Sequence, residues 1–191
     1  MGKHVYKGRF IEKNGDKILY DYLVSINLEP ISKGRLPIVK ELEGKILNNL
    51  ENHKYEDNNS FCFGVGLHEK IIYRRMIEDF EWFVEKQIKG FLGAAAHMDI
   101  YGVWGADEFS HDEIKARQES ITRLIGFYNF KESGLKLLEK NIISNEGYCY
   151  CGSNKFYKNC HITKIREISK YINKIDLLQE IKLLEKKYKG E

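Results

Sequence analysis

The sequence predicts an α+β fold in which an antiparallel sheet of about four strands is followed by helices that pack on it. Three observations support this prediction. The first third of the chain has β-branched and aromatic residues at period two, whereas the middle and the end repeat apolar residues every three or four positions. Near the C-terminus, three of the four cysteines lie within twelve residues, which predicts a small metal-binding knuckle before the last helix.

The strands are predicted from alternation and from turn chemistry. Within residues 18–28, every second residue is apolar or aromatic, so that one face carries Tyr20, Tyr22, Val24, Ile26 and Leu28. Asn14-Gly15 is typical of a tight hairpin turn, and this strand is therefore expected to pair with residues 6–11. The remaining two strands are expected at residues 36–39 and 60–67.

Helical periodicity begins near residue 70. Residues 70–95 place apolar side chains three and four positions apart, which makes a stripe wide enough to cover a sheet face. A capping box that starts at Ser110 predicts a second helix. A last amphipathic helix is expected over residues 163–187. Because the strands come first and the helices follow, sheet and helices are expected to form separate layers.

Length and composition predict a compact, water-soluble chain. It has 191 residues, of which 42% are hydrophobic and 31% are charged. We expect one main domain over residues 1–140 and a metal-bearing appendage over residues 145–191. No window approaches about 18 consecutive apolar residues, which argues against a membrane span, and the N-terminus lacks the apolar stretch of a secretory signal. The sequence therefore predicts a cytoplasmic protein without membrane contact.

The net charge of +3 is unevenly distributed. Residues 149–191 hold ten Lys and Arg against five Asp and Glu, which leaves residues 1–148 slightly acidic. The body of the protein thus gives no electrostatic reason to expect nucleic acid. The basic tail is expected to be either a solvated helix face or a contact for an acidic partner. Nucleic-acid binding through the tail is a third possibility, and it would show a steep salt dependence.

Residues 145–161 hold the densest set of metal ligands in the chain. Three thiols and one imidazole occur there, those of Cys149, Cys151, Cys160 and His161. Zn²⁺ binds such a Cys₃His set tetrahedrally, and four protein ligands leave no open position for catalysis. Gly152-Ser153 permits the tight turn that brings the last two ligands back. The sequence therefore predicts a structural zinc ion, with free thiols as the alternative.

This segment resembles the SEC-C motif, a small zinc module found at the end of the bacterial translocation motor and attached to many other proteins. The resemblance is carried by Cys149, Cys151, Gly152, Ser153, Tyr157, Lys158, Cys160 and His161. The segment departs from the motif where Asn154 replaces the usual glycine, although Asn also tolerates left-handed geometry. The resemblance implies that residues 145–191 dock onto a partner protein.

The fourth cysteine, Cys62, lies apart from this cluster. At period two, the bulky residues of the segment 60–67 occupy one face, and Cys62 shares the other face with Ser60, Gly64 and Gly66. Two interpretations stay open. Cys62 is either an accessible nucleophile beside small residues or a buried cysteine, which is the common state of a lone free thiol.

The order of these features resembles the ubiquitin-conjugating enzymes over roughly residues 5–130. His53 lies nine residues before Cys62, where those enzymes carry a His-Pro-Asn element shortly before the nucleophile. The Asn of that element is absent here, because Lys54-Tyr55 follows His53. The resemblance implies a ubiquitin-conjugating-like fold with Cys62 and His53 as catalytic residues.

With its C-terminal cysteine cluster, the chain is also similar to the ubiquitin-conjugating-like proteins of cyclic-oligonucleotide antiphage defence (CBASS) operons. That resemblance implies a cGAS-like nucleotidyltransferase as the partner, whose C-terminus forms a thioester with Cys62 and is then transferred to an amine. Nothing in the 191 residues provides an adenylation domain, so activation of the acyl group is expected either to come from elsewhere or to be bypassed. The alternative is a non-catalytic adaptor that uses the same fold and zinc module only to bind a partner protein.

Overall fold

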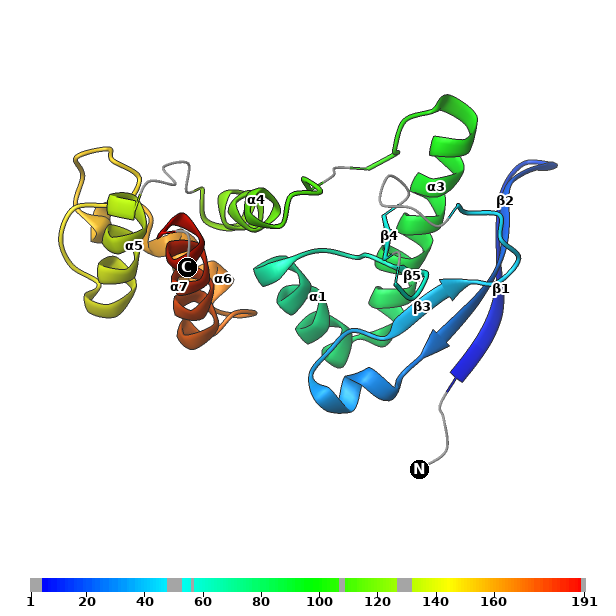
Figure 1. Ribbon diagram of the computed structural model, residues 1–191, viewed down its shortest axis with the longest axis horizontal. Helices are drawn as coiled ribbons and strands as arrows, with labels where there is room; N and C mark the ends of the chain where they lie inside the picture. The colour runs from blue at the N-terminus through cyan, green and yellow to red at the C-terminus, as the bar shows by residue number, and fades with distance from the viewer. Residues whose placement is uncertain (1–4, 48–52, 56, 107–108, 127–131, 190–191) are drawn as a thin grey trace. The chain divides into compact units, whose positions relative to one another are not determined.

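The computed structural model describes residues 5–47, 53–55, 57–106, 109–126 and 132–189. They form two compact units, which we treat separately (Figure 1). Unit 1 is Met1–Gly64 with Ile72–Glu108, and unit 2 is Val65–Ile71 with Phe109–Glu191. One helix, α1 (Gly66–Glu78), begins in unit 2 and ends in unit 1.

Unit 1 is built on a three-stranded antiparallel sheet. Its strands are β1 (Val5–Asn14), β2 (Lys17–Asn27) and β3 (Ile38–Glu41), in that order across the sheet. The predicted hairpin is confirmed, since β1 pairs with β2 and Gly15 takes the left-handed conformation in the turn at a φ of 61°. The predicted inward face of β2 is also confirmed, because its buried side chains are Tyr20, Tyr22, Val24 and Ile26.

A four-stranded sheet is not confirmed among the described residues. The expected fourth strand, at residues 60–67, is represented only by β5 (Ser60–Phe61), which pairs with β4 (Lys54–Tyr55) in a separate two-stranded ribbon. The extended backbone does not continue to residue 67 because Gly66 has a φ of 54° and begins α1. The α+β class is therefore confirmed, with a smaller sheet than the sequence predicts.

The predicted helix over residues 70–95 is broken into several pieces. After α1 and a short turn of helix, α2 (Phe80–Trp82), the chain forms a π-helical segment, η3 (Phe83–Ile88), and then α3 (Lys89–Tyr101). The break has a local cause: the side chain of Asp79 accepts a hydrogen bond from the backbone N–H of Trp82 at 2.8 Å and so starts a new helix. The core of unit 1 combines the inward face of β2 with Ile72, Met76, Phe83, Ile88, Phe91 and Leu92.

Unit 2 is mainly helical. Its further helices are α4 (Glu113–Ile125), α5 (Glu132–Ser144), α6 (Ile162–Ile168) and α7 (Lys174–Lys189), with a short 3₁₀ turn, η4 (Tyr157–Asn159). Sequence analysis did not identify α5, because Gly134 near its start and Asn141 within its apolar stripe weaken the helical pattern. Unit 2 has its own core, which contains Leu67, Ile121, Ile125, Leu135, Leu138, Tyr150, Tyr157 and Ile181.

Two helix boundaries differ from the prediction. Asp112, not Ser110, is the N-cap of α4, and its side chain accepts a hydrogen bond from the backbone N–H of Lys115 at 2.8 Å. The helix predicted over residues 163–187 is two helices, and the Asn173 side chain accepts a hydrogen bond from the N–H of Asp176 at the start of α7. With these boundaries, no helix within the described ranges is long and apolar enough to cross a membrane.

The boundaries of the two units differ from those of the expected domains, residues 1–140 and 145–191. Helices α4 and α5 share a hydrophobic core with the cysteine-rich segment, since Ile121, Leu135 and Tyr150 all belong to it. The cysteine-rich segment therefore shares a helical unit with α4 and α5, whereas the sequence predicts an appendage that begins at residue 145.

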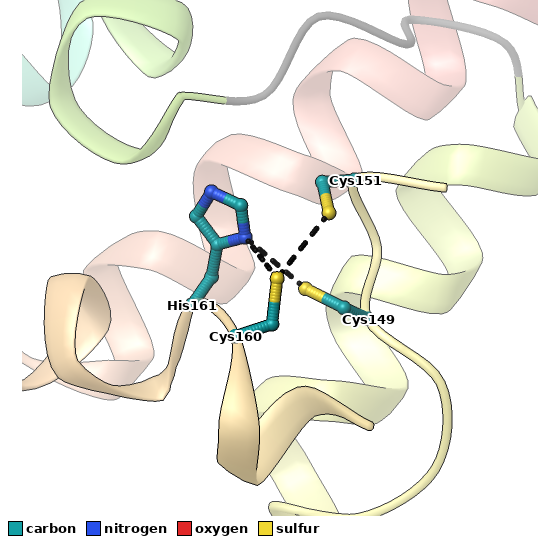
Figure 2. Close-up of side chains that lie close together, drawn as sticks. All are labelled: Cys149, Cys151, Cys160 and His161. Carbon is teal, nitrogen blue, oxygen red and sulfur yellow. Dashed lines mark hydrogen bonds between the residues drawn. The ribbon is translucent and has the colours of Figure 1, made fainter. Parts of the chain in front are cut away.

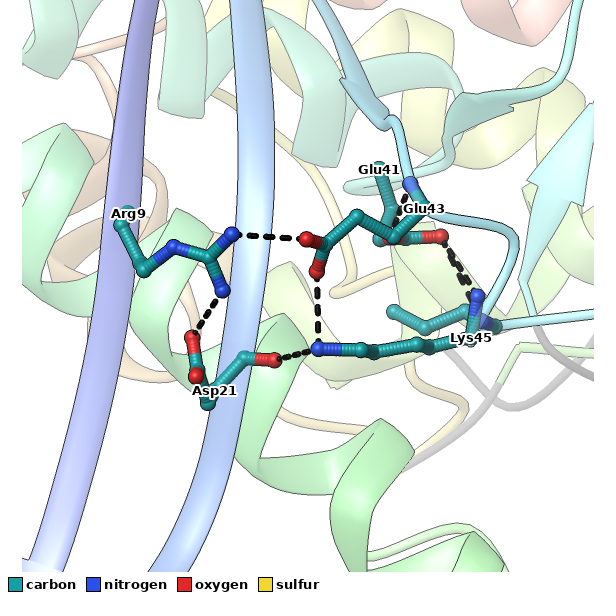
Figure 3. A network of polar contacts seen from close by, with 6 residues as sticks. Arg9, Asp21, Glu41, Glu43 and Lys45 are labelled. Carbon is teal, nitrogen blue, oxygen red and sulfur yellow. Dashed lines mark hydrogen bonds and ion pairs between the residues drawn. The ribbon is translucent and has the colours of Figure 1, made fainter.

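A buried carboxylate organises the loop after β3. Glu41 is only 3% exposed, and its two oxygens accept hydrogen bonds from the backbone N–H groups of Glu43 at 2.6 Å and Lys45 at 2.9 Å (Figure 3). The buried ammonium group of Lys54 donates to the carbonyl of Ile46 at 2.8 Å in the same loop. Burial lowers the pKa of Lys54, and the charge of Glu41 opposes this shift. Two buried charged groups thus tie the loop to β3 and β4.

An exposed ion-pair network lies on the surface beside this loop (Figure 3). Arg9 of β1 contacts Asp21 of β2 at 2.7 Å and Glu43 at 2.6 Å, and Lys45 contacts Glu43 at 2.7 Å. These groups are solvated, so each pair is expected to contribute less than about 1 kcal/mol to the stability of unit 1.

We predict that Glu41→Ala lowers the free energy of unfolding of unit 1 by about 2–3 kcal/mol, because it removes a buried charged acceptor shared by three backbone N–H groups, including the buried one of Ile46. The matched control is Glu43→Ala, which removes only exposed ion pairs and should cost less than about 1 kcal/mol. Urea unfolding followed by tryptophan fluorescence measures this directly, since both tryptophans, Trp82 and Trp104, belong to unit 1. Equal effects of the two substitutions would contradict the prediction.

Candidate metal centre and the surroundings of Cys62

A short hairpin in unit 2 builds the candidate metal centre. Tyr148 and Phe156 form an antiparallel bridge, and the backbone N–H of Cys149 donates to the carbonyl of Lys155 at 2.8 Å. At the tip, Gly152 has a φ of 73° and Asn154 a φ of 57°. Asn154 thus takes the left-handed conformation that an Asn tolerates in place of the usual glycine. This turn reverses the chain, so that residues far apart along the hairpin face one another.

The hairpin and the start of α6 bring the four predicted ligands together. Figure 2 shows the side chains of Cys149, Cys151, Cys160 and His161 converging on one point, and their ligand atoms all lie within 4.8 Å of one another. The imidazole Nδ1 of His161 lies 3.3 Å from the Cys149 sulfur and 3.1 Å from the Cys160 sulfur. The sulfur atoms of Cys151 and Cys160 are 3.7 Å apart.

The sulfur–sulfur distance fits one shared metal ion, and the two sulfur–nitrogen distances are shorter than a bound ion would set them. A tetrahedral site with metal–sulfur bonds of about 2.3 Å places two sulfurs about 3.8 Å apart, and a sulfur and an imidazole nitrogen about 3.6 Å apart. The observed separation of the Cys151 and Cys160 sulfurs, 3.7 Å, is close to this value. The donor set and its geometry therefore form a possible metal-binding site, as the sequence predicts.

The surroundings of the thiols differ from one cysteine to the next. Burial raises the pKa of the Cys149 thiol to about 12. Burial also raises the pKa of Cys151, but hydrogen bonds from Ser153, Cys149 and Cys160 outweigh it, and the net pKa is lowered. The hydroxyl of Ser153 lies 3.1 Å from the Cys151 sulfur and 3.5 Å from the Cys160 sulfur. A metal ion held here must replace the thiol protons, so its affinity is expected to fall at low pH.

A buried side chain that sequence analysis missed holds the backbone of the metal-binding hairpin. Asn141 of α5 is fully buried, and its amide nitrogen donates to the carbonyls of Glu146 at 2.8 Å and Tyr148 at 3.0 Å. Its amide oxygen accepts a hydrogen bond from the backbone N–H of Tyr150 at 2.9 Å. Asn141 thus holds three backbone groups on both sides of the first metal ligand. The only sequence signal is a polar residue within an apolar helical stripe.

Tyr150 anchors the hairpin at a second point. Its ring is 1% exposed, and its hydroxyl donates to the carbonyl of Ile125 at 2.9 Å, at the end of α4. Tyr157, on the returning side of the hairpin, is also fully buried in the core of unit 2. The candidate metal centre is therefore embedded in the helical core by two aromatic residues and one amide.

The structure places Cys62 and His53 opposite one another in unit 1. The two-stranded ribbon ends beside them, and the backbone N–H of Cys62 donates to the carbonyl of His53 at 2.7 Å. Cys62 is partly exposed, and its sulfur lies 3.7 Å from the carbonyl oxygen of Gly64. The imidazole of His53 packs against Trp104, with 4.6 Å between ring centroids. The backbones of the two predicted catalytic residues thus meet.

The small residues near Cys62 do not leave the open path that the sequence suggests. Gly64 is buried. Gly66 faces the carboxylate of Glu180, and a Cβ atom at this position would lie 2.8 Å from an oxygen of that group. Arg117 holds the same carboxylate in two contacts at 2.8 and 2.9 Å. Gly66 is therefore required by a buried ion pair of unit 2, which sequence patterning alone does not reveal.

No protein-family model matches the chain, and neither the curated proteins nor the solved structures compared with it show a significant similarity. Any statement about its activity therefore depends on the two groups of residues described above. These are the Cys₃His cluster of unit 2 and the pair His53 and Cys62 of unit 1.

We predict that the purified protein holds one divalent metal ion per chain and loses it on Cys160→Ser substitution, because the remaining three donors no longer complete the shell. Ser153→Ala is the matched control: it removes a hydroxyl near two sulfurs but no ligand atom, so the metal content should remain. Elemental analysis gives the stoichiometry. Chelation should loosen the amides of unit 2 in hydrogen exchange and leave the tryptophan fluorescence of unit 1 unchanged. A metal-free wild-type protein would refute the site.

We further predict that Asn141→Leu destabilises unit 2 and weakens its affinity for the metal, although it adds apolar surface to a buried position. The substitution leaves two carbonyls and one N–H without partners, at about 1–3 kcal/mol for each buried group. Lys140→Ala, at an exposed position of α5, serves as the control. Metal affinity measured by competition with a chromogenic chelator should fall at least tenfold only in Asn141→Leu.

Proposed function

We propose that the chain is a ubiquitin-conjugating-like acyl carrier, in which Cys62 holds the C-terminus of a partner protein as a thioester. The observation that carries the proposal is the 2.7 Å hydrogen bond between the backbone N–H of Cys62 and the carbonyl of His53. This hydrogen bond joins Cys62 and His53, the two residues that the sequence predicts to be catalytic, at the end of the two-stranded ribbon of β4 and β5. A partly exposed thiol at the end of a strand is a position from which a thiolate can meet an external acyl group.

The proposed chemistry uses the two properties of a thiolate, good nucleophilicity and easy departure. The sulfur of Cys62 attacks the activated carbonyl of the partner's C-terminus, a C–S bond forms, and the activating group leaves with its electron pair. The nitrogen of an acceptor amine then attacks the thioester carbonyl. The new C–N bond replaces the C–S bond, the amine loses a proton to solvent, and the thiolate is released. In this scheme a separate catalyst activates the C-terminal carboxyl group of the partner before Cys62 attacks it.

His53 is proposed to position Cys62 in this reaction. Its backbone has a φ of 51°, which is uncommon for a residue with a side chain and is often found at functional sites. The stacking of its ring on Trp104 supports this conformation, and its carbonyl holds the backbone of Cys62. Since no Asn follows His53, stabilisation of the oxyanion would have to come from other donors.

The metal of the knuckle is proposed to be a structural Zn²⁺. Three thiolates and one imidazole are the soft and borderline donors that zinc binds in closed tetrahedral sites. The attachment of the hairpin to the core through Tyr150 and Tyr157 supports a structural role. By the resemblance to the SEC-C motif, unit 2 is proposed to dock the partner, and by the resemblance to CBASS proteins that partner is a cGAS-like nucleotidyltransferase.

One observation favours a second candidate, a non-catalytic adaptor with the same metal module. The sulfur of Cys62 lies 3.7 Å from the carbonyl oxygen of Gly64, a residue that is itself buried. A thiol held in this way need not react. The two candidates differ in one measurable property, the rate at which Cys62 of the folded protein reacts with iodoacetamide.

We predict that wild-type protein co-expressed with a cGAS-like nucleotidyltransferase, the proposed partner, forms an adduct that thiols release. Cys62→Ser should accumulate a more persistent oxyester, because an alkoxide leaves less readily than a thiolate. Cys62→Ala should form no adduct and should keep its fold, since little volume is lost. Intact mass spectrometry under non-reducing conditions distinguishes the three outcomes.

The control for this experiment is Cys160→Ser, which removes a proposed metal ligand and leaves Cys62 in place. The adduct should form on the same residue, with less partner captured if unit 2 docks the partner. Absence of a thiol-sensitive adduct in the wild type, or its survival in Cys62→Ala, would exclude the carrier and leave the adaptor.

A further inference from the structure

The knuckle hairpin presents two aromatic rings to solvent. Tyr148 is 59% exposed and Phe156 is 52% exposed, and their rings stack across the hairpin with centroids 5.2 Å apart and planes 10° apart. The next aromatic residues of the same hairpin, Tyr150 and Tyr157, point into the core of unit 2. The core of unit 2 therefore does not require Tyr148 and Phe156, and their rings are accessible to a ligand.

Positive charge accompanies this face. Lys155 directly precedes Phe156, and Lys158 follows two residues later in η4. Between residues 155 and 174 the chain carries six Lys and Arg against one Glu, and all of these side chains are exposed: Lys155, Lys158, Lys164, Arg166, Glu167, Lys170 and Lys174. Among the described residues, neither Lys155 nor Lys158 forms an ion pair with a carboxylate. The charge is therefore available to an external anion.

We propose that this surface binds single-stranded nucleic acid. Sequence-tolerant binding of single strands combines a basic surface that follows the phosphates with aromatic rings on which the bases stack. An acidic peptide would satisfy the lysines but would not need the flat rings. The excess of positive charge lies in residues 149–191, which belong to unit 2, so the binding is expected there. This proposal does not depend on Cys62 or on acyl transfer.

The aromatic pair also has a simpler explanation, which the test must separate. Aromatic residues opposite one another in a hairpin stabilise it by about 0.2–1 kcal/mol without any ligand. Tyr148→Leu keeps an apolar cross-strand contact and removes the flat face, whereas Tyr148→Phe keeps the ring. Comparison of these two variants isolates the stacking surface from the stability of the hairpin, and metal content confirms that the knuckle is folded in each.

The experiment measures the binding of a fluorescein-labelled oligo-dT of about 15 nucleotides to the full chain by anisotropy, a length within the range that single-strand binding folds cover. Wild type and Tyr148→Phe should bind alike, and Tyr148→Leu should bind about five- to a hundredfold more weakly. Lys155→Gln should reduce the slope of log affinity against log salt by about 0.7, the value of one phosphate contact on a single strand. Lys136→Gln, in an ion pair with Glu132 on α5, should leave the slope unchanged.

Three results would overturn the proposal. The first is the absence of binding at about 50 mM salt, where electrostatic contacts with nucleic acid are strong. The second is equal binding by Tyr148→Leu and Tyr148→Phe. The third is competition by polyglutamate as effective as by unlabelled oligonucleotide, which would assign the surface to an acidic protein.

Discussion

The buried amide of Asn141 is the interaction on which unit 2 depends, because it joins a helix to the hairpin that carries the metal ligands. It contacts the carbonyls of Glu146 and Tyr148 and the N–H of Tyr150, so every hydrogen bond it makes goes to backbone. Cys149 lies between the last two of these groups and has no freedom to move independently of them. A metal ion at this position binds to a ligand whose place is already set by α5, which reduces the loss of entropy on binding.

Those parts of the fold that depend on neighbouring residues could be predicted from the sequence. The ligand set is local, with each of its four members within two residues of another ligand, and its spacing alone indicates a shared ion. The hairpin between β1 and β2 depends on Asn14-Gly15, and the buried face of β2 depends on alternation within one strand. In each case the chemistry that determines the structure lies within about ten residues of sequence.

The parts that sequence analysis missed depend on partners far along the chain. Gly66 appears in the sequence as a small residue beside Cys62, but its role is set by Glu180, more than a hundred residues later. The buried charge of Glu41 is stabilised by backbone groups of a loop that no pattern marks. Helix α5 was missed because Asn141 interrupts its row of apolar residues. The amide of Asn141 makes hydrogen bonds to the backbone of the metal-binding hairpin, which an apolar side chain could not do. A residue that breaks the local pattern of apolar positions thus indicates a contact with a distant part of the chain, but the sequence does not show which residue is the partner.

The proposed metal also affects which thiol is available for chemistry. Of the four cysteines, Cys149, Cys151 and Cys160 lie close enough to share one ion, and the sulfurs of the last two are 3.7 Å apart. Without a metal, two thiols at this distance are poised for oxidation and would compete with Cys62 for electrophiles. Coordination withdraws all three from exchange. In the proposed arrangement the ion therefore does more than hold unit 2 together, because it leaves Cys62 as the single thiol in the chain that can carry an acyl group.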